Sequence, residues 1–204
     1  MRRAGIAAAT FGLVAITLWW STPPALRAPA AGPQPDHDIE RWLALRESAE
    51  DQANGRVPDT GKRIRWRSPG QRTPIAVVYL HGFSATRQEI APTAERVAEH
   101  LGANLFETRL AGHGRRSAPL AGVRAEDWLA DGIEALRIGQ RLGERVVVIG
   151  TSTGATLALA LADQAEFAAV SELVMISPNI APADANAEWL TRPAGPLLAR
   201  LIAG

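Results

Sequence analysis

The chain has 204 residues, of which 47% are hydrophobic, enough to bury one good core, so a single domain is expected. Its 22 basic and 21 acidic residues leave a net charge of +1, which gives no indication of a nucleic acid or another polyanionic partner. There is no cysteine, which excludes disulfides, a thiol nucleophile and a cysteine-based metal site. We expect neither a metal nor a cofactor, because metal-ligand spacing is absent among the four histidines, His37, His81, His100 and His113.

The N-terminus predicts an apolar helix that targets the chain to a membrane. Arg2 and Arg3 precede a charge-free run from Ala4 to Trp20, whose length lies between a signal-peptide core and a full span of about 20 residues. Its terminal tryptophan pair favours an anchor over residues 1–20, whereas Ala28 to Ala30 offers a cleavage pattern. We expect a domain exported from an inner-membrane anchor, or secreted to the periplasm if the segment is cleaved; a buried helix of a soluble protein is the alternative.

Residues 21–37 are rich in proline and alanine, which predicts an extended linker. An amphipathic helix capped near Asp38 should follow, with an apolar face formed by Ile39, Trp42, Leu43 and Leu45. Lys62 to Arg67 alternates basic and apolar residues, which is more typical of an edge strand with one wet face than of an anion site.

Strands and helices alternate along the rest of the chain. Buried strands are predicted at Pro74–Leu80, Asn104–Leu110, Arg145–Ile149 and Glu172–Ser177. Helices are predicted at Thr86–Gly102, Arg124–Leu142 and Ala155–Ala160. This order predicts an α/β fold with a doubly wound, mostly parallel sheet and a ligand site beyond the carboxyl ends of the strands.

A serine lies at the sharpest of these strand-to-helix turns. Ser152 follows a Val/Ile strand and precedes an Ala/Leu helix, and Gly150 and Gly154 allow the two backbones to approach. Its hydroxyl should stand above the sheet edge, with the Thr153 N–H at the helix N-terminus directed towards charge on a bound carbonyl. The alternative is a serine that merely caps the helix.

Three motifs in order give the chain a resemblance to the α/β-hydrolase family, in particular to bacterial esterases and to members like monoacylglycerol lipase and lysophospholipase. They are His81-Gly82-Phe83, Gly112-His113-Gly114 and Gly150-x-Ser152-x-Gly154, and the resemblance covers about Pro74 to Pro178. It implies that Ser152 is the nucleophile and that the Phe83 and Thr153 N–H groups form the oxyanion hole. His81 and Gly82 would support the loop, and neither His81 nor His113 would be the base.

In that family the acid and a histidine follow the serine. Here no histidine follows His113, and Asp184 is a weak candidate for the acid. Residues 183–204 resemble the start of a lipase lid. Residues 38–204 are therefore expected to be the N-terminal part of a hydrolase domain whose sheet is incomplete at the C-terminus.

The sequence thus favours a serine hydrolase of carboxylic esters. The apolar N-terminal and C-terminal segments favour lipid-like acyl esters and contact with a membrane. A catalytically incomplete fragment or non-catalytic homologue, and an acyltransferase on the same fold, remain open alternatives.

Overall fold

The computed structural model describes residues 34–36, 38–116, 120–181, 195 and 200. The predicted apolar helix, most of the linker, Asp184 and nearly all of the lid-like segment lie outside these residues. Within the described part of the chain, no helix is long and apolar enough to cross a membrane.

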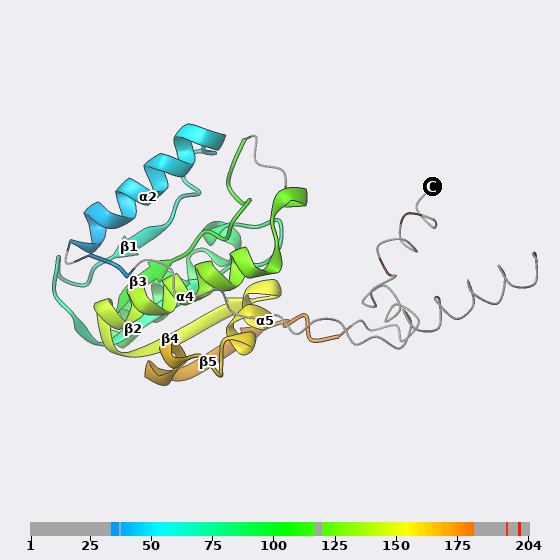
Figure 1. The fold of residues 1–204 in the computed structure, drawn as a ribbon. Coiled ribbons are helices and arrows are strands. Elements are labelled where there is room, and N and C mark those ends of the chain that lie inside the picture. The colour runs from blue at the N-terminus through cyan, green and yellow to red at the C-terminus, as the bar shows by residue number, and fades with distance from the viewer. Residues whose placement is uncertain (1–33, 37, 117–119, 182–194, 196–199, 201–204) are drawn as a thin grey trace, which may run out of the picture. The chain divides into compact units, whose positions relative to one another are not determined.

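The centre of the domain is one five-stranded sheet, in which all strands but one are parallel (Figure 1). Its spatial order is β1-β3-β2-β4-β5, and β1 pairs with β3 in the antiparallel direction. The strands are β1 (Arg63–Arg65), β2 (Thr73–Leu80), β3 (Asn104–Glu107), β4 (Gly143–Thr151) and β5 (Val170–Ile176). The predicted mostly parallel sheet is confirmed, and the Lys62–Arg67 segment does form an edge strand.

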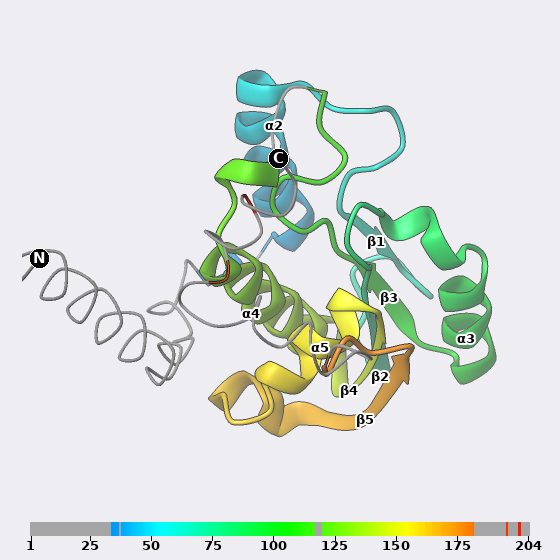
Figure 2. The ribbon, with the colours of Figure 1, turned by 90° about the vertical axis from the view of Figure 1, so that its right-hand side faces the viewer.

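Helices cover both faces of this sheet, as a doubly wound fold requires. They are α2 (Ile39–Asn54), α3 (Thr93–Leu101), α4 (Ala125–Leu142) and α5 (Thr153–Ala160). Along β2, Val78 and Leu80 face the core under α2, α4 and α5, whereas Val77 and Tyr79 face α3. Figure 2 shows α3 and α4 on opposite sides of the sheet.

Helix α2 begins where the sequence predicts, but its buried face differs. The Asp38 carboxylate accepts the Arg41 N–H at 3.0 Å and caps the helix. Ile39, Leu43 and Glu47, spaced by four residues, are buried. Leu45 is 63% exposed, so its assignment to the apolar face was wrong.

Buried charges attach α2 to the sheet. Arg109, only 2% exposed, follows β3, and its guanidinium lies 2.8 Å from Glu47 and 3.4 Å from Asp51. The other oxygen of the Glu47 carboxylate, Oε2, accepts the backbone N–H of Lys62 at 3.0 Å. The buried Lys62 ammonium in turn pairs with Asp131 and Glu134 of α4. Each of these buried charges therefore has an opposite charge beside it, as burial requires.

The single helix predicted over Thr86–Gly102 was wrong. The structure has a short 3₁₀ helix, η1 (Arg87–Ile90), before α3. Pro92 interrupts the helical run because the residue before a proline is driven out of the α region, and Ala91 is indeed extended. The predicted end holds, since Gly102 adopts φ 61° at the C-cap.

Candidate active site

Ser152 occupies the turn between β4 and α5 in a conformation that non-glycine residues rarely adopt. Its φ is 49° and its ψ is −115°. The Ser152 N–H donates to the Ile176 carbonyl of β5 at 2.8 Å, which fixes the turn to the neighbouring strand. Backbone strain of this kind persists only where the surroundings enforce it, and it concentrates at functional sites.

The two flanking glycines lie where side chains would collide with backbone. A Cβ at Gly154 would lie 2.6 Å from the His81 carbonyl oxygen and still closer to that of Leu80. A Cβ at Gly150 would lie 2.6 Å from Ala155 Cα. The strand, the helix and the end of β2 therefore meet around Ser152 at distances that exclude larger residues.

The loop after β2 faces the serine. A Cβ built on Gly82 would lie 3.3 Å from Ser152 Cβ, so the two residues are in close proximity. Among the described residues, the Phe83 and Thr153 N–H groups have no hydrogen-bond acceptor. Two free donors thus lie next to the serine, one on the loop and one at the N-terminus of α5.

His81 and His113 both hold loops together. His81 Nε2 accepts the Leu110 N–H at 3.0 Å, so Nδ1 carries the proton and donates to the Gly82 carbonyl at 2.8 Å. His113 Nε2 accepts the Ser84 N–H at 3.0 Å, and its Nδ1 donates to the Ala111 carbonyl at 3.0 Å. Since all four ring nitrogens are occupied by backbone groups, neither histidine is available to take a proton from Ser152.

The burial of His81 predicts acid sensitivity. Desolvation lowers the pKa of His81 from 6.5 to about 4, so the unfolded chain binds a proton more readily. The resulting stability is complete above pH 6.5 and is lost as the pH falls through 4, a difference of about 3 kcal/mol. Urea unfolding of wild type and His81→Gln at pH 7 and pH 4 should show the steeper loss in wild type.

The comparison with the variant is needed because Asp131 acts in the opposite direction. Burial raises the pKa of Asp131 to about 6, so its contribution to stability grows as the pH falls. Asp131 is present in both proteins and cancels in their difference. His100→Gln, a change at an exposed histidine, serves as the control. Equal pH dependence in wild type and His81→Gln would contradict the prediction.

An aromatic group borders the loop. The Phe83 ring is 56% exposed and lies edge-on to His113 and Trp128, with ring centroids 5.9 and 6.1 Å apart. Trp128 Nε1 donates to the Ala111 carbonyl at 3.0 Å. The Phe83 side chain is thereby held at the surface, on the residue that follows Gly82.

Three residues near the serine escaped the sequence analysis. Glu89 of η1 accepts the Gly82 N–H, and the Tyr79 hydroxyl lies between Glu89 and Thr151. The sequence feature that could have indicated these contacts is Tyr79 itself, because it is the one tyrosine of the chain and follows a run of aliphatic residues in its strand. A buried tyrosine hydroxyl needs a polar partner.

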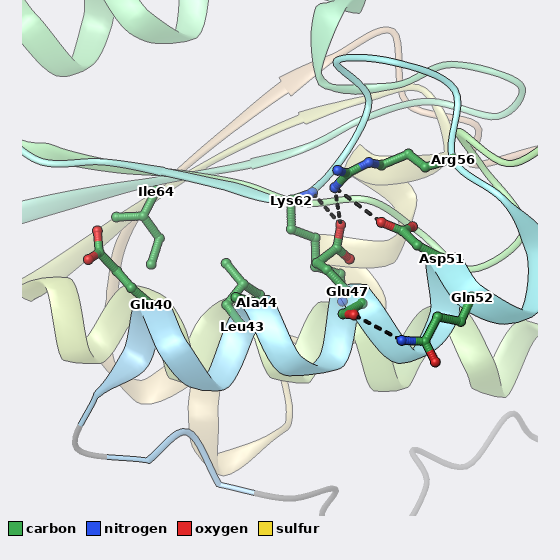
Figure 3. A pocket seen from close by; sticks show the side chains of 10 residues that line it. Glu40, Leu43, Ala44, Glu47, Asp51, Gln52, Arg56, Lys62 and Ile64 are labelled. Carbon is green, nitrogen blue, oxygen red and sulfur yellow. Dashed lines mark hydrogen bonds and ion pairs between the residues drawn. The ribbon is translucent and has the colours of Figure 1, made fainter.

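A hollow of about 610 Å³ lies away from Ser152, between α2 and the segment from Arg56 to Ile64 (Figure 3). Glu47, Asp51, Arg56 and the Lys62 backbone bond with one another along its wall. Its charges are satisfied internally, so it does not compete with the serine as the reactive site. Among the described residues, no group of three or more His, Asp or Glu side chains is placed to hold a metal.

A mostly parallel sheet in which a strand, β4, ends in a strained serine between glycines is typical of the α/β-hydrolase class of folds. Residues 77–203, more than half of the chain, match the family model described as Alpha/beta hydrolase family. The chain belongs to this family, and the resemblance found in the sequence is confirmed.

Proteins similar to this chain include a monoacylglycerol lipase and a lipolytic enzyme. The chain is 32% identical to the thermostable monoacylglycerol lipase of Bacillus sp. (strain H-257) over 90 residues, which are 44% of this chain and 36% of that protein. A solved structure from the metagenome-derived lipolytic enzymes LipS and LipT has a TM-score of 0.53 and 23% identity, over 66% of this chain and 52% of that one. Est1E of Butyrivibrio proteoclasticus, solved with ferulic acid, has a TM-score of 0.49 and 18% identity, over 58% and 48%. The chain thus spans about a third to a half of these relatives.

Proposed function

We propose that the chain carries the nucleophile and oxyanion hole of a serine hydrolase that acts on carboxylic esters. The single observation that carries the proposal is the strained Ser152 close to Gly82, with acceptor-free N–H groups, among the described residues, on the next residue of each segment, Thr153 and Phe83. The similarity to a monoacylglycerol lipase supports an ester as the substrate.

In this mechanism Ser152 Oγ attacks the ester carbonyl carbon, and the hydroxyl proton passes to a base. The carbonyl oxygen becomes an oxyanion, which accepts hydrogen bonds from the Phe83 and Thr153 N–H groups. The carbon–oxygen bond to the leaving group then breaks, the leaving oxygen takes the proton from the protonated base and departs as the alcohol, and the acyl group remains on Ser152. A fixed donor in such a site stabilises the transition state by about 3 to 4 kcal/mol.

The base must come from a group other than His81 or His113, since their ring nitrogens are occupied. Among the described residues no histidine is hydrogen-bonded to the Ser152 hydroxyl, and a serine in that state retains only the residual effect of the oxyanion hole and binding, about 10³ to 10⁴-fold over water. Residues 1–204 should therefore acylate slowly and deacylate more slowly still.

Stopped-flow measurement of p-nitrophenyl acetate cleavage tests this proposal. We expect a burst of one nitrophenolate per chain followed by very slow turnover, because the acyl group trapped on Ser152 blocks the site. Ser152→Ala should show no burst, because it has no hydroxyl to acylate. A burst that persists in Ser152→Ala would refute the nucleophile. Robust turnover by the wild-type chain would contradict the expectation that neither His81 nor His113 acts as the base.

We also propose that lipid-like esters are the substrates and that residues 1–20 bring the domain to a membrane. The motivation is the charge-free run after Arg2 and Arg3 and the exposed Phe83 ring on the residue that follows Gly82. Cell fractionation of the full chain and of a version lacking residues 1–30 is the test. Membrane association should vanish in the shorter version; a full chain found in the cytosol would contradict the targeting proposal.

A further inference from the structure

Glu89 links the two backbone segments that meet at Ser152. Its Oε2 accepts the Gly82 N–H at 2.8 Å and the Tyr79 hydroxyl at 2.8 Å. The Tyr79 oxygen also lies 3.3 Å from Thr151 Oγ1, and Tyr79 is fully buried. Because Tyr79 donates its proton to the carboxylate, Thr151 is the donor to Tyr79. A chain of hydrogen bonds thus runs from the residue before Ser152 to the residue before Phe83.

The loop is held on both sides of the Phe83 N–H. Glu89 takes the amide before it, on Gly82, and His113 takes the amide after it, on Ser84 at 3.0 Å. The middle amide is left without an acceptor within the described residues. With both neighbours fixed, the peptide of Phe83 has little freedom to turn away.

Gly82 lies close to both the Glu89 carboxylate and the serine. The position of a Cβ on Gly82 is 2.7 Å from Glu89 Oε1 and 3.3 Å from Ser152 Cβ. Glu89 itself is exposed, whereas the next residue of the short η1 helix, Ile90, packs against the core. The Glu89 carboxylate therefore acts on the loop through its hydrogen bonds and not through apolar packing.

We propose that Glu89 is a positioning residue, whose carboxylate holds the Gly82 amide and, through Tyr79, the side chain of Thr151, so that the Phe83 N–H faces the Ser152 hydroxyl. This inference rests on the proposed function, because it assigns Glu89 to the oxyanion hole of that site. A misplacement of about 1 Å in such a site can cost about 100-fold in rate.

The test uses the full chain with Glu89→Ala, Glu89→Gln and the control Glu99→Ala, which removes an exposed glutamate on α3. Two quantities are measured: the burst rate constant with p-nitrophenyl acetate, and the hydrogen-exchange rate of the Gly82 N–H by NMR. Glu89→Ala should lower the burst rate about 10- to 100-fold and accelerate Gly82 exchange in a chain that still unfolds cooperatively. Some loss of stability is expected as well, because the buried Gly82 N–H and Tyr79 hydroxyl lose their acceptor. Glu89→Gln, which keeps an acceptor oxygen, should restore most of both the burst rate and the slow exchange.

The two readouts separate this inference from the proposed function. A wild-type chain without any burst would remove the proposed function, and exchange would still decide whether Glu89 holds the Gly82 amide. Unchanged Gly82 exchange in Glu89→Ala, or a wild-type burst rate in that variant, would overturn the role of Glu89. A burst rate lost equally in Glu89→Gln would also overturn it, because the acceptor is retained there.

Discussion

Gly154→Val is expected to lower the free energy of unfolding by about 4 kcal/mol or more. The new Cβ would lie 2.6 Å from the His81 carbonyl oxygen, and both this carbonyl and that of Leu80 belong to the backbone. Backbone at the end of β2 cannot move aside without disturbing the strand and the loop that follows it. Overpacking against a rigid neighbour is among the few mechanisms that produce losses of this size. Urea denaturation followed by circular dichroism measures the change.

Two controls make the result specific. Gly122→Ala places a Cβ where no atom lies within 4 Å, so it should leave stability nearly unchanged. Ser152→Ala removes only the hydroxyl and should also leave the fold intact. If Gly154→Val melted at the same temperature as wild type, the close approach of strand and helix would be refuted.

Arg109→Met should cost about 3 to 5 kcal/mol, because it removes the nearest cationic partner of the buried Glu47 carboxylate. Arg109 is 2% exposed and Glu47 is 6% exposed, with 2.8 Å between guanidinium and carboxylate. Methionine keeps much of the apolar volume of the side chain, so the loss reports the unpaired charge more than a cavity. Chemical denaturation at neutral pH gives the value.

The double variant identifies the cause. Glu47→Gln removes the charge while keeping an acceptor for the Lys62 N–H, so Arg109→Met combined with Glu47→Gln should recover part of the loss. Arg96→Met, at an exposed position on α3, is the control. A double variant as unstable as the sum of the two single variants would contradict the charge-pairing explanation.

Features governed by neighbouring residues were predictable from the sequence. The Val/Ile run of β4 and the glycines around Ser152 act over a few positions, and the structure has the strand, the turn and the helix in that order. Pro92 was an equally local signal, and overlooking it produced the single helix that the structure divides in two. Leu45 shows what helical spacing alone cannot predict. Which face of a helix is buried depends on the elements that the helix packs against, and Leu45 of α2 is exposed.

The polar interactions that hold the fold and the loops near Ser152 depend on distant parts of the chain. Arg109 and Glu47 are 62 positions apart, and the Ser84 and His113 that bond in the loops are 29 apart. No spacing rule links such partners, because the topology of the sheet brings them together. Glu89 was missed for a related reason, since its role follows from the turn of η1 and not from a motif.

The central claim is that Ser152 accepts the acyl group, and the most direct measurement is to locate that group. After reaction with p-nitrophenyl acetate, the chain would be digested and its peptides weighed by mass spectrometry, with and without added imidazole. Imidazole can take the serine proton in place of a histidine, so it should accelerate acylation. We predict an acetyl group on the peptide that contains Ser152, formed faster with imidazole and absent in Ser152→Ala. Acetyl groups found elsewhere, or formed equally in Ser152→Ala, would contradict the account.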